Sequence, residues 1–115
     1  MEITPKQPIK FFTLEDKKGV TSTLKKIKKF LTKKRWIQGA LQDDKGGYCL
    51  LGASEKIEGP YENDVDEIFD HEASVRGYDT AVIYNDHPRR THEQIVGFLE
   101  SCINRAEKGR VVVSE

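Results

Sequence analysis

The sequence predicts a mainly helical α+β domain of three or four helices, with at most a small short-stranded sheet or hairpin. Apolar side chains recur at helical spacing over residues 21–34 and 91–108, and glycine or proline separates the shorter apolar stretches. At 115 residues the chain is long enough to bury a core without metals or disulfides. We expect one globular domain over residues 21–109, preceded by an extended segment at 1–20 and followed by a tail or short edge strand at 110–115.

The N-terminal third is predicted to contain one short strand and one long helix. Two prolines make residues 1–10 extended, and Lys10–Leu14 is a candidate strand that the turn Asp16–Gly19 ends. Apolar residues then alternate with lysines at helical spacing, which predicts a helix from Thr21 to Lys34. Thr21 or Ser22 is a suitable N-cap residue, and the basic end of the segment suits the helix dipole.

Two shorter helices are predicted in the middle of the chain. Tyr48–Ile57 is a short apolar segment, and Gly52 inside it costs about 1 kcal/mol relative to alanine. We therefore expect another backbone segment to lie close to Gly52. The second helix spans Asn63–Arg76 and ends at Gly77. Residues 81–84 fit either a buried strand or a helical turn, because the segment is too short for its period to decide.

A capping signal precedes the last predicted helix. Thr91 and Gln94 are spaced as in a capping box, in which each side chain bonds a backbone N–H of the other residue. The helix then runs from Thr91 to Lys108 with one apolar stripe. The segments that could pair with the N-terminal strand in a small sheet are residues 38–42, 81–84 and 111–113.

Two features of the composition bear on the compartment. No apolar run approaches the roughly 20 residues of a membrane span, and the N-terminus lacks the apolar core of a signal peptide. Cys49 and Cys102 lie in apolar, helical segments, which is typical of buried free thiols in a reducing environment. We expect a cytoplasmic protein without a membrane partner.

A net charge of zero hides a strong segregation of charge along the chain. Residues 1–36 carry eleven Lys or Arg and three acidic residues, a net charge of +8, so residues 37–115 carry −8. A basic helix of this kind can neutralise phosphates or dock on an acidic surface, although many lysine-rich helices are only solvated. The candidate partner-binding residues are Lys25, Lys26, Lys28, Lys29, Lys33, Lys34 and Arg35, together with Arg89 and Arg90.

Several short sequence segments, which we call islands, each combine an aromatic or polar residue with glycine or alanine. This combination is typical of places where backbone segments approach closely and a turn must be held. We expect the islands to pack together at the centre of the fold. The side-chain amides of Gln38 and Asn85 would form hydrogen bonds with buried backbone groups there. The residues of this structural motif are Trp36, Gln38, Gly39, Cys49, Gly52, Ala53, Asn85, Asp86 and Thr91.

The order of these islands resembles a family of small bacterial and phage proteins of unknown function. That family has an N-terminal helix running into Trp-x-Gln-Gly, then a Cys-x-x-Gly-Ala helix, then Trp-Asn-Asp before a Thr-capped final helix. The resemblance covers roughly residues 21–107. This chain departs from it at Tyr84, where the family usually has tryptophan, and in a shorter turn before Cys49. The resemblance implies a fold and no assigned activity.

The same islands allow a thiol-hydrolase hypothesis. Cys49 would be the nucleophile, His87 the base and Gln38 an oxyanion donor, with Asn85 or Asp86 orienting the imidazole. The simpler interpretation is that Cys49 packs as a small apolar residue and that Asn85 and Asp86 bond the backbone of their own turn.

No metal site and no cofactor are predicted. His87 and His92 are five residues apart across a turn, which matches no standard ligand spacing. The glycines at positions 46 and 47 lack the flanking residues of a phosphate-binding loop.

These observations favour a non-enzymatic interaction protein, such as an accessory or phage-type modulator of a larger complex. Its partner would be an acidic protein surface, nucleic acid or a second copy of the chain. Two alternatives remain open at this point: a nucleic-acid-binding protein that uses the basic N-terminal helix, and the Cys–His thiol hydrolase.

Overall fold

The computed structural model of the protein describes residues 9–11, 14–57, 59–108 and 110–112. Five helices and one pair of strands lie within these residues. In chain order the elements are β1 (Ile9–Phe11), α1 (Leu14–Phe30), α2 (Leu50–Ile57), α3 (Glu62–Val75), α4 (Ala81–Asp86), α5 (His92–Glu107) and β2 (Arg110–Val112).

The mainly helical prediction is confirmed, but the α+β label and the count of three or four helices are not. The described residues contain a fifth helix, because the segment left open at 81–84 folds as α4. Apart from two isolated bridges, strand structure within the described residues is limited to the three-residue antiparallel pair of β1 and β2, in which Lys10 pairs with Val111. This pair is too short to form a sheet layer, although β2 contacts α3 and α5.

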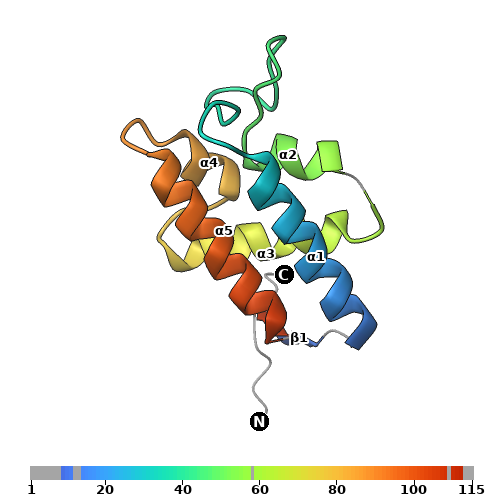
Figure 1. Cartoon of the computed structure of the whole chain (residues 1–115). Coiled ribbons are helices and arrows are strands. Elements are labelled where there is room, and N and C mark those ends of the chain that lie inside the picture. Colours follow the sequence, from blue (N-terminus) through green and yellow to red (C-terminus); the bar gives the residue numbers. More distant parts are fainter. Residues whose placement is uncertain (1–8, 12–13, 58, 109, 113–115) are drawn as a thin grey trace.

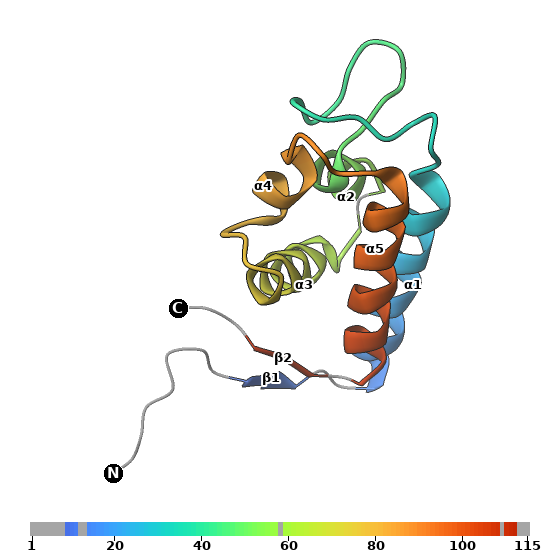
Figure 2. The same cartoon turned by 90° about the vertical axis from the view of Figure 1, so that its left-hand side faces the viewer.

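Two groups of helices enclose the core. Helices α1 and α5 lie side by side, and α2, α3 and α4 pack against them from the other side (Figures 1 and 2). The chain between α1 and α2 extends beyond the ends of the helices (Figure 2). The largest fully buried side chains between the two groups are Phe69, Phe98, Leu24, Ile27, Leu31, Leu50, Ile68, Ile95 and Leu99.

Helix α1 starts seven residues earlier than predicted. It begins at Leu14 and runs through Gly19, so the turn expected at residues 16–19 and the cap expected at Thr21 or Ser22 are wrong. The Tyr61 ring lies directly over Gly19, and a Cβ at that position would overlap it. Glycine is thus required here for packing against a residue distant in sequence, although glycine usually interrupts a helix. Helix α1 therefore occupies residues 14–20 of the segment that was expected to be extended, and residues 1–8 and 12–13 of that segment lie outside the described residues.

Helix α1 also ends earlier than predicted, at Phe30 instead of Lys34. The chain tightens into turns there, since the Thr32 N–H bonds the Phe30 carbonyl over 2.9 Å and the Arg35 N–H bonds the Thr32 carbonyl over 3.0 Å. Basic residues therefore leave the helix and continue onto the following turn.

The predictions for the second, third and last helices are confirmed to within two residues. Gly77 has a φ of +93°, the left-handed conformation expected after the end of α3. Thr91 and Gln94 form both bonds of the predicted capping box at the start of α5. Thr80 caps α4 by accepting a hydrogen bond from the Ile83 N–H over 3.2 Å.

A close backbone approach occurs at Gly52, as the sequence predicts. A Cβ on Gly52 would overlap the carbonyl oxygen of Leu41, which belongs to the loop between α1 and α2. That carbonyl also accepts a hydrogen bond from the Cys49 N–H over 3.1 Å. The absence of a side chain at Gly52 is therefore what allows this loop to seat on the start of α2.

A buried carboxylate joins α3 to α5. Glu72 accepts from Arg76 Nε and from Arg105 Nη2, each over 2.8 Å. The two guanidinium groups compensate the cost of burying its charge. Among the described residues no helix combines the length and apolar character needed to cross a membrane.

Candidate basic binding surface

A hydrogen-bonded joint fixes the loop between α1 and α2 against α4. Its centre is Asn85, whose side chain is fully buried. Asn85 Oδ1 accepts from Trp36 Nε1 over 2.8 Å and from the Leu50 N–H over 3.2 Å. Asn85 Nδ2 donates to the Ile37 carbonyl over 3.1 Å and to Asp86 Oδ1 over 2.9 Å. The partners settle the orientation of the amide, because an indole N–H only donates and a carbonyl only accepts.

Two further residues complete this joint. Gln38 Nε2 donates to the carbonyls of Asn85 over 2.9 Å and His87 over 2.7 Å. Asp86 Oδ1 accepts from the Gly39 N–H over 3.0 Å. We refer to Trp36, Gln38, Gly39, Asn85 and Asp86 as the Asn85 joint. Because the bonds between the loop and the α4 region span 47 to 49 residues of sequence, the joint sets where the loop lies relative to the helices.

The remainder of the loop is held by short backbone pairings. The Tyr48 N–H bonds the Arg35 carbonyl over 2.8 Å, and the Ile37 N–H bonds the Tyr48 carbonyl over 3.0 Å. At the tip, Asp43 Oδ1 accepts from the N–H groups of Lys45 over 2.9 Å and Gly47 over 2.7 Å. These bonds lower the pKa of the Asp43 carboxyl, with the Gly47 bond contributing most. The two bonds are therefore fully formed when the pH is above the usual pKa range of a carboxyl group. They are lost only when the pH falls below that range.

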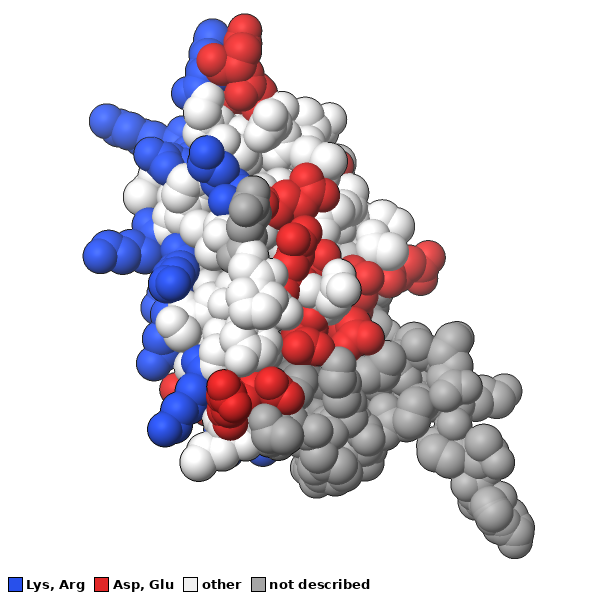
Figure 3. Space-filling view, turned by 90° about the vertical axis from the view of Figure 1, so that its right-hand side faces the viewer, with Lys and Arg blue, Asp and Glu red and all other residues white. Residues whose placement is uncertain are grey.

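Lysines line the exposed side of α1 and the turn that follows it. Figure 3 shows Lys and Arg side chains gathered along one edge of the molecule, with a band of Asp and Glu beside them. The segregation of charge in the sequence thus becomes a segregation on the surface. The cationic residues of α1 and its following turn are Lys17, Lys18, Lys25, Lys26, Lys28, Lys29, Lys33, Lys34 and Arg35.

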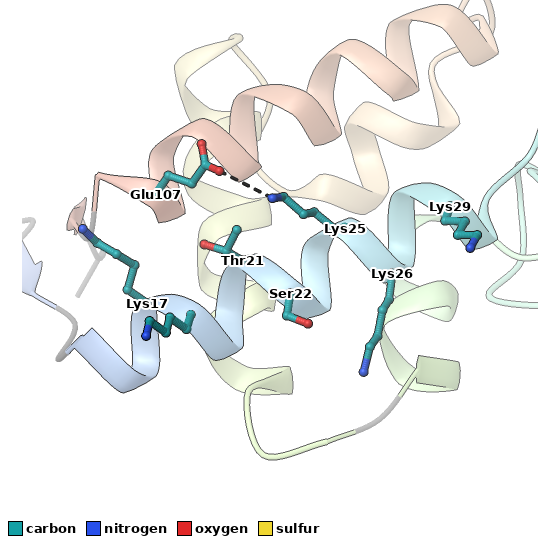
Figure 4. Close-up of a pocket in the computed structure, with 8 residues that line it drawn as sticks. Lys17, Thr21, Ser22, Lys25, Lys26, Lys29 and Glu107 are labelled. Atoms are coloured by element: carbon teal, nitrogen blue, oxygen red, sulfur yellow. Dashed lines mark ion pairs between the residues drawn. The ribbon is translucent and has the colours of Figure 1, made fainter.

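A shallow hollow of about 570 Å³ lies along α1, and we call it the helix hollow (Figure 4). Lys25 within it pairs with Glu107 of α5 over 3.7 Å. Lys28, on the adjoining side, pairs with Glu100 over 3.0 Å. Thr21 lines the hollow, and its Oγ1 is buried without a hydrogen-bond partner among the described residues. The lining residues are Lys17, Lys18, Thr21, Ser22, Lys25, Lys26, Lys29 and Glu107.

A second hollow of about 410 Å³ lies where the loop folds back beside the end of α1, and we call it the loop hollow. Arg35 lies over the Phe30 ring, with 4.4 Å between its guanidinium carbon and the ring centroid. The Phe30 and Tyr48 rings are tilted neighbours, with centroids 5.1 Å apart. None of the lining residues is acidic. They are Phe30, Thr32, Lys34, Arg35, Lys45, Gly46, Tyr48 and Lys56.

The structure does not bring Arg89 and Arg90 to this surface. Both belong to the turn between α4 and α5, and neither lines the helix hollow or the loop hollow. Arg90 packs inward: its guanidinium carbon is 3.6 Å from the Tyr84 ring centroid, and its Nε donates to the Tyr84 carbonyl over 2.8 Å. Arg90 therefore supports the fold, and Arg89 is an exposed residue that lines neither hollow.

The groups of the thiol-hydrolase hypothesis are occupied by other bonds. Cys49 is 2% exposed, and its Sγ accepts from the Gly52 N–H over 3.4 Å. Burial raises the pKa of the Cys49 thiol, with a smaller contribution from the charge of Asp86. His87 Nδ1 accepts from the Arg89 N–H over 3.1 Å, and the Gln38 side-chain amide donates to two backbone carbonyls. This arrangement favours a protonated, inert thiol.

We expect both cysteines to alkylate slowly in the folded protein at neutral pH. Cys102 is fully buried, and burial raises the pKa of its thiol well above the ordinary value. Iodoacetamide labelling followed by mass spectrometry measures this directly. The expected result is a rate for each thiol at least about tenfold below that in denaturant. Rapid labelling of Cys49 in the folded state would contradict its burial and would support the thiol-hydrolase hypothesis.

The described residues contain no group of three or more His, Cys, Asp or Glu side chains that could hold a metal ion. His92, one of the candidate ligands considered from sequence, has its Nε2 at 2.8 Å from the Leu31 carbonyl oxygen. This contact joins the start of α5 to the end of α1, so the imidazole has a structural role.

Sequence reasoning missed part of the cationic surface. Lys45 and Lys56 join Lys34 and Arg35 only because the loop folds back. The bond between the Tyr48 N–H and the Arg35 carbonyl brings these segments together. The basic residues Lys33, Lys34 and Arg35 were visible in the sequence, but this pairing was not.

Comparison with known proteins gives one result. Residues 16–105 match a protein family described as a family of unknown function, DUF6197. This confirms the resemblance to a family of unknown function. The corresponding searches of curated proteins and of solved structures found no match.

Proposed function

We propose that this chain, which belongs to the DUF6197 family of unknown function, is a non-enzymatic binding protein that docks an anionic partner. The docking face is the basic surface, which we define as the cationic residues of α1, of its following turn and of the loop hollow. Such a protein would act as an accessory component of a larger complex. Its buried free thiols are typical of a reducing compartment, so we place it in the cytoplasm.

The observation that carries this proposal is the gathering of cations on one continuous surface. The lining residues of the helix hollow and the loop hollow together include eight lysines and one arginine, against one acidic residue. Like charges brought together in this way raise the local potential and attract anions from solution. Exposed ion pairs such as Lys25–Glu107 are worth little, so an anionic partner can replace them.

The geometry supports binding better than catalysis. The candidate nucleophile is buried, and the candidate base and oxyanion donor hold the loop in place. The basic surface, by contrast, consists mostly of exposed side chains on α1, on the turn that follows it and around the loop hollow.

The proposal predicts that removing two α1 lysines weakens binding to a polyanion. We expect Lys26→Gln with Lys29→Gln to lower the affinity for a fluorescein-labelled single-stranded oligonucleotide roughly tenfold at low salt, because two phosphate contacts are lost. Fluorescence anisotropy measures the affinity. A labelled polyglutamate peptide in the same titration distinguishes an acidic protein surface from nucleic acid as the partner.

The matched control removes the same net charge from residues that line neither hollow. Arg89→Gln with Lys108→Gln removes two exposed cations from the α4–α5 turn and from the end of α5. We expect this variant to bind within about twofold of the wild type. Equal losses for both pairs would show that binding follows total charge alone, and would overturn the proposed surface.

A further inference from the structure

We propose that the loop hollow binds a nucleoside phosphate, with its phosphates on the cations and its base against the aromatic rings. This inference rests on the proposed anion-binding function and names the chemical class that one part of the basic surface recognises. The source of that group is either a free nucleotide or one unit of a single-stranded nucleic acid.

The first argument is the absence of an acidic side chain from the lining of the loop hollow. Lys34, Arg35, Lys45 and Lys56 line it, and no acidic residue does. The helix hollow differs, because Glu107 lines it and pairs with Lys25 over 3.7 Å. Four cations without a lining carboxylate favour a ligand that carries several negative charges, such as a phosphate chain.

The second argument is the presence of aromatic rings beside those cations. Phe30 and Tyr48 are both partly exposed, and their centroids lie 5.1 Å apart. Arg35 adds a flat guanidinium group over the Phe30 ring. Aromatic rings and arginine planes are the surfaces on which bases stack in single-stranded nucleic-acid sites. A ligand that combines a flat ring with phosphates satisfies both parts of the lining.

The third argument is that the site is held in shape without a ligand. The Tyr48 N–H bonds the Arg35 carbonyl over 2.8 Å, which brings the two sides of the loop together. The Asp43 carboxylate fixes the turn that carries Lys45 and Gly46. The volume of about 410 Å³ lies within the range of roughly 300–1,000 Å³ that is typical of small-molecule sites.

The test compares ligands and variants by isothermal titration at low salt. The ligands are ATP without added metal, inorganic tripolyphosphate and a single-stranded oligonucleotide. The hollow variant is Lys34→Gln with Lys45→Gln and Lys56→Gln. Its matched control is Lys17→Gln with Lys26→Gln and Lys29→Gln, which removes three cations from the helix hollow. Circular dichroism melting checks that both variants fold.

We expect the wild type to bind ATP more tightly than tripolyphosphate, because only ATP brings a base to the rings. The hollow variant should lose ATP affinity roughly tenfold or more, and the control variant less than about threefold. If the oligonucleotide binds more tightly than ATP and is also weakened by the hollow variant, the nucleotide comes from a strand. Tighter binding of ATP instead identifies a free nucleotide.

Three results would overturn the inference. One is equal affinity for ATP and tripolyphosphate, and another is an equal loss in the two variants. The third is a lowered melting temperature of the hollow variant with unchanged ATP affinity, which would show that Lys56 only complements the end of α2. In each case, salt-sensitive oligonucleotide binding through α1 would leave the proposed function standing. Absence of all binding would reject both.

Discussion

Gly52→Ala should destabilise the protein by about 3 kcal/mol or more, near or above the upper end of the usual cost of overpacking a core. The added Cβ would overlap the Leu41 carbonyl oxygen, and that oxygen belongs to backbone that is already bonded to the Cys49 N–H. A flexible side chain could rotate away, but this peptide cannot move without losing that bond. The melting temperature should fall by roughly 10 °C or more.

Gly97→Ala is the matched control for this prediction. Gly97 lies inside α5, and a Cβ built on it meets no atom within 4 Å. Alanine is a better helix former than glycine, so we expect Gly97→Ala to stabilise the protein by up to about 1 kcal/mol. An unchanged melting temperature for Gly52→Ala, beside a stabilised Gly97→Ala, would disprove the close approach of the loop to α2.

Asn85→Ala should have the second large effect, a destabilisation of about 3–5 kcal/mol. The substitution leaves the Trp36 Nε1–H, the Leu50 N–H and the Ile37 carbonyl without their partner in a closed environment. Each unsatisfied buried group costs about 1–3 kcal/mol, and relaxation of the loop recovers part of the sum. Urea unfolding followed by circular dichroism measures the change.

Asn85→Asp separates hydrogen bonding from packing at the same position. The aspartate keeps the shape and the acceptor, but it replaces the donor with an oxygen that faces the Ile37 carbonyl and the Asp86 carboxylate. We expect it to be nearly as destabilising as Asn85→Ala. The exposed Asn104→Ala serves as control and should stay within about 0.5 kcal/mol of the wild type. A tolerated Asn85→Asp would mean that the donor bonds contribute little.

Local signals in the sequence were enough to predict most of the helices. The capping box at Thr91 and Gln94, and the left-handed glycine after α3, depend on residues that lie within one turn. The start of α1 could not be predicted in this way. Gly19 is tolerated inside that helix because the Tyr61 ring, 42 residues away, covers it. The undecided segment at residues 81–84 became helical with its cap at Thr80.

The candidate site was predictable only in part, for the same physical reason. The polar character of Gln38 and Asn85 beside turns suggested that they satisfy buried backbone groups, and their bonds agree with this role. The lysines of α1 were also visible as a basic stripe. The loop hollow was not visible in the sequence. Lys45 and Lys56 reach Arg35 only through the backbone pairing of Tyr48 with Arg35, which composition does not encode.

The central claim is that the basic surface docks an anionic partner, and the salt dependence of wild-type binding tests it most directly. Anisotropy of a labelled single-stranded oligonucleotide should be titrated at several salt concentrations. We expect the logarithm of the affinity to fall linearly with the logarithm of the salt concentration. The slope should be about −0.7 for each phosphate contact, and about −2 or steeper in total. A flat dependence, or no binding at the lowest salt, would contradict the account.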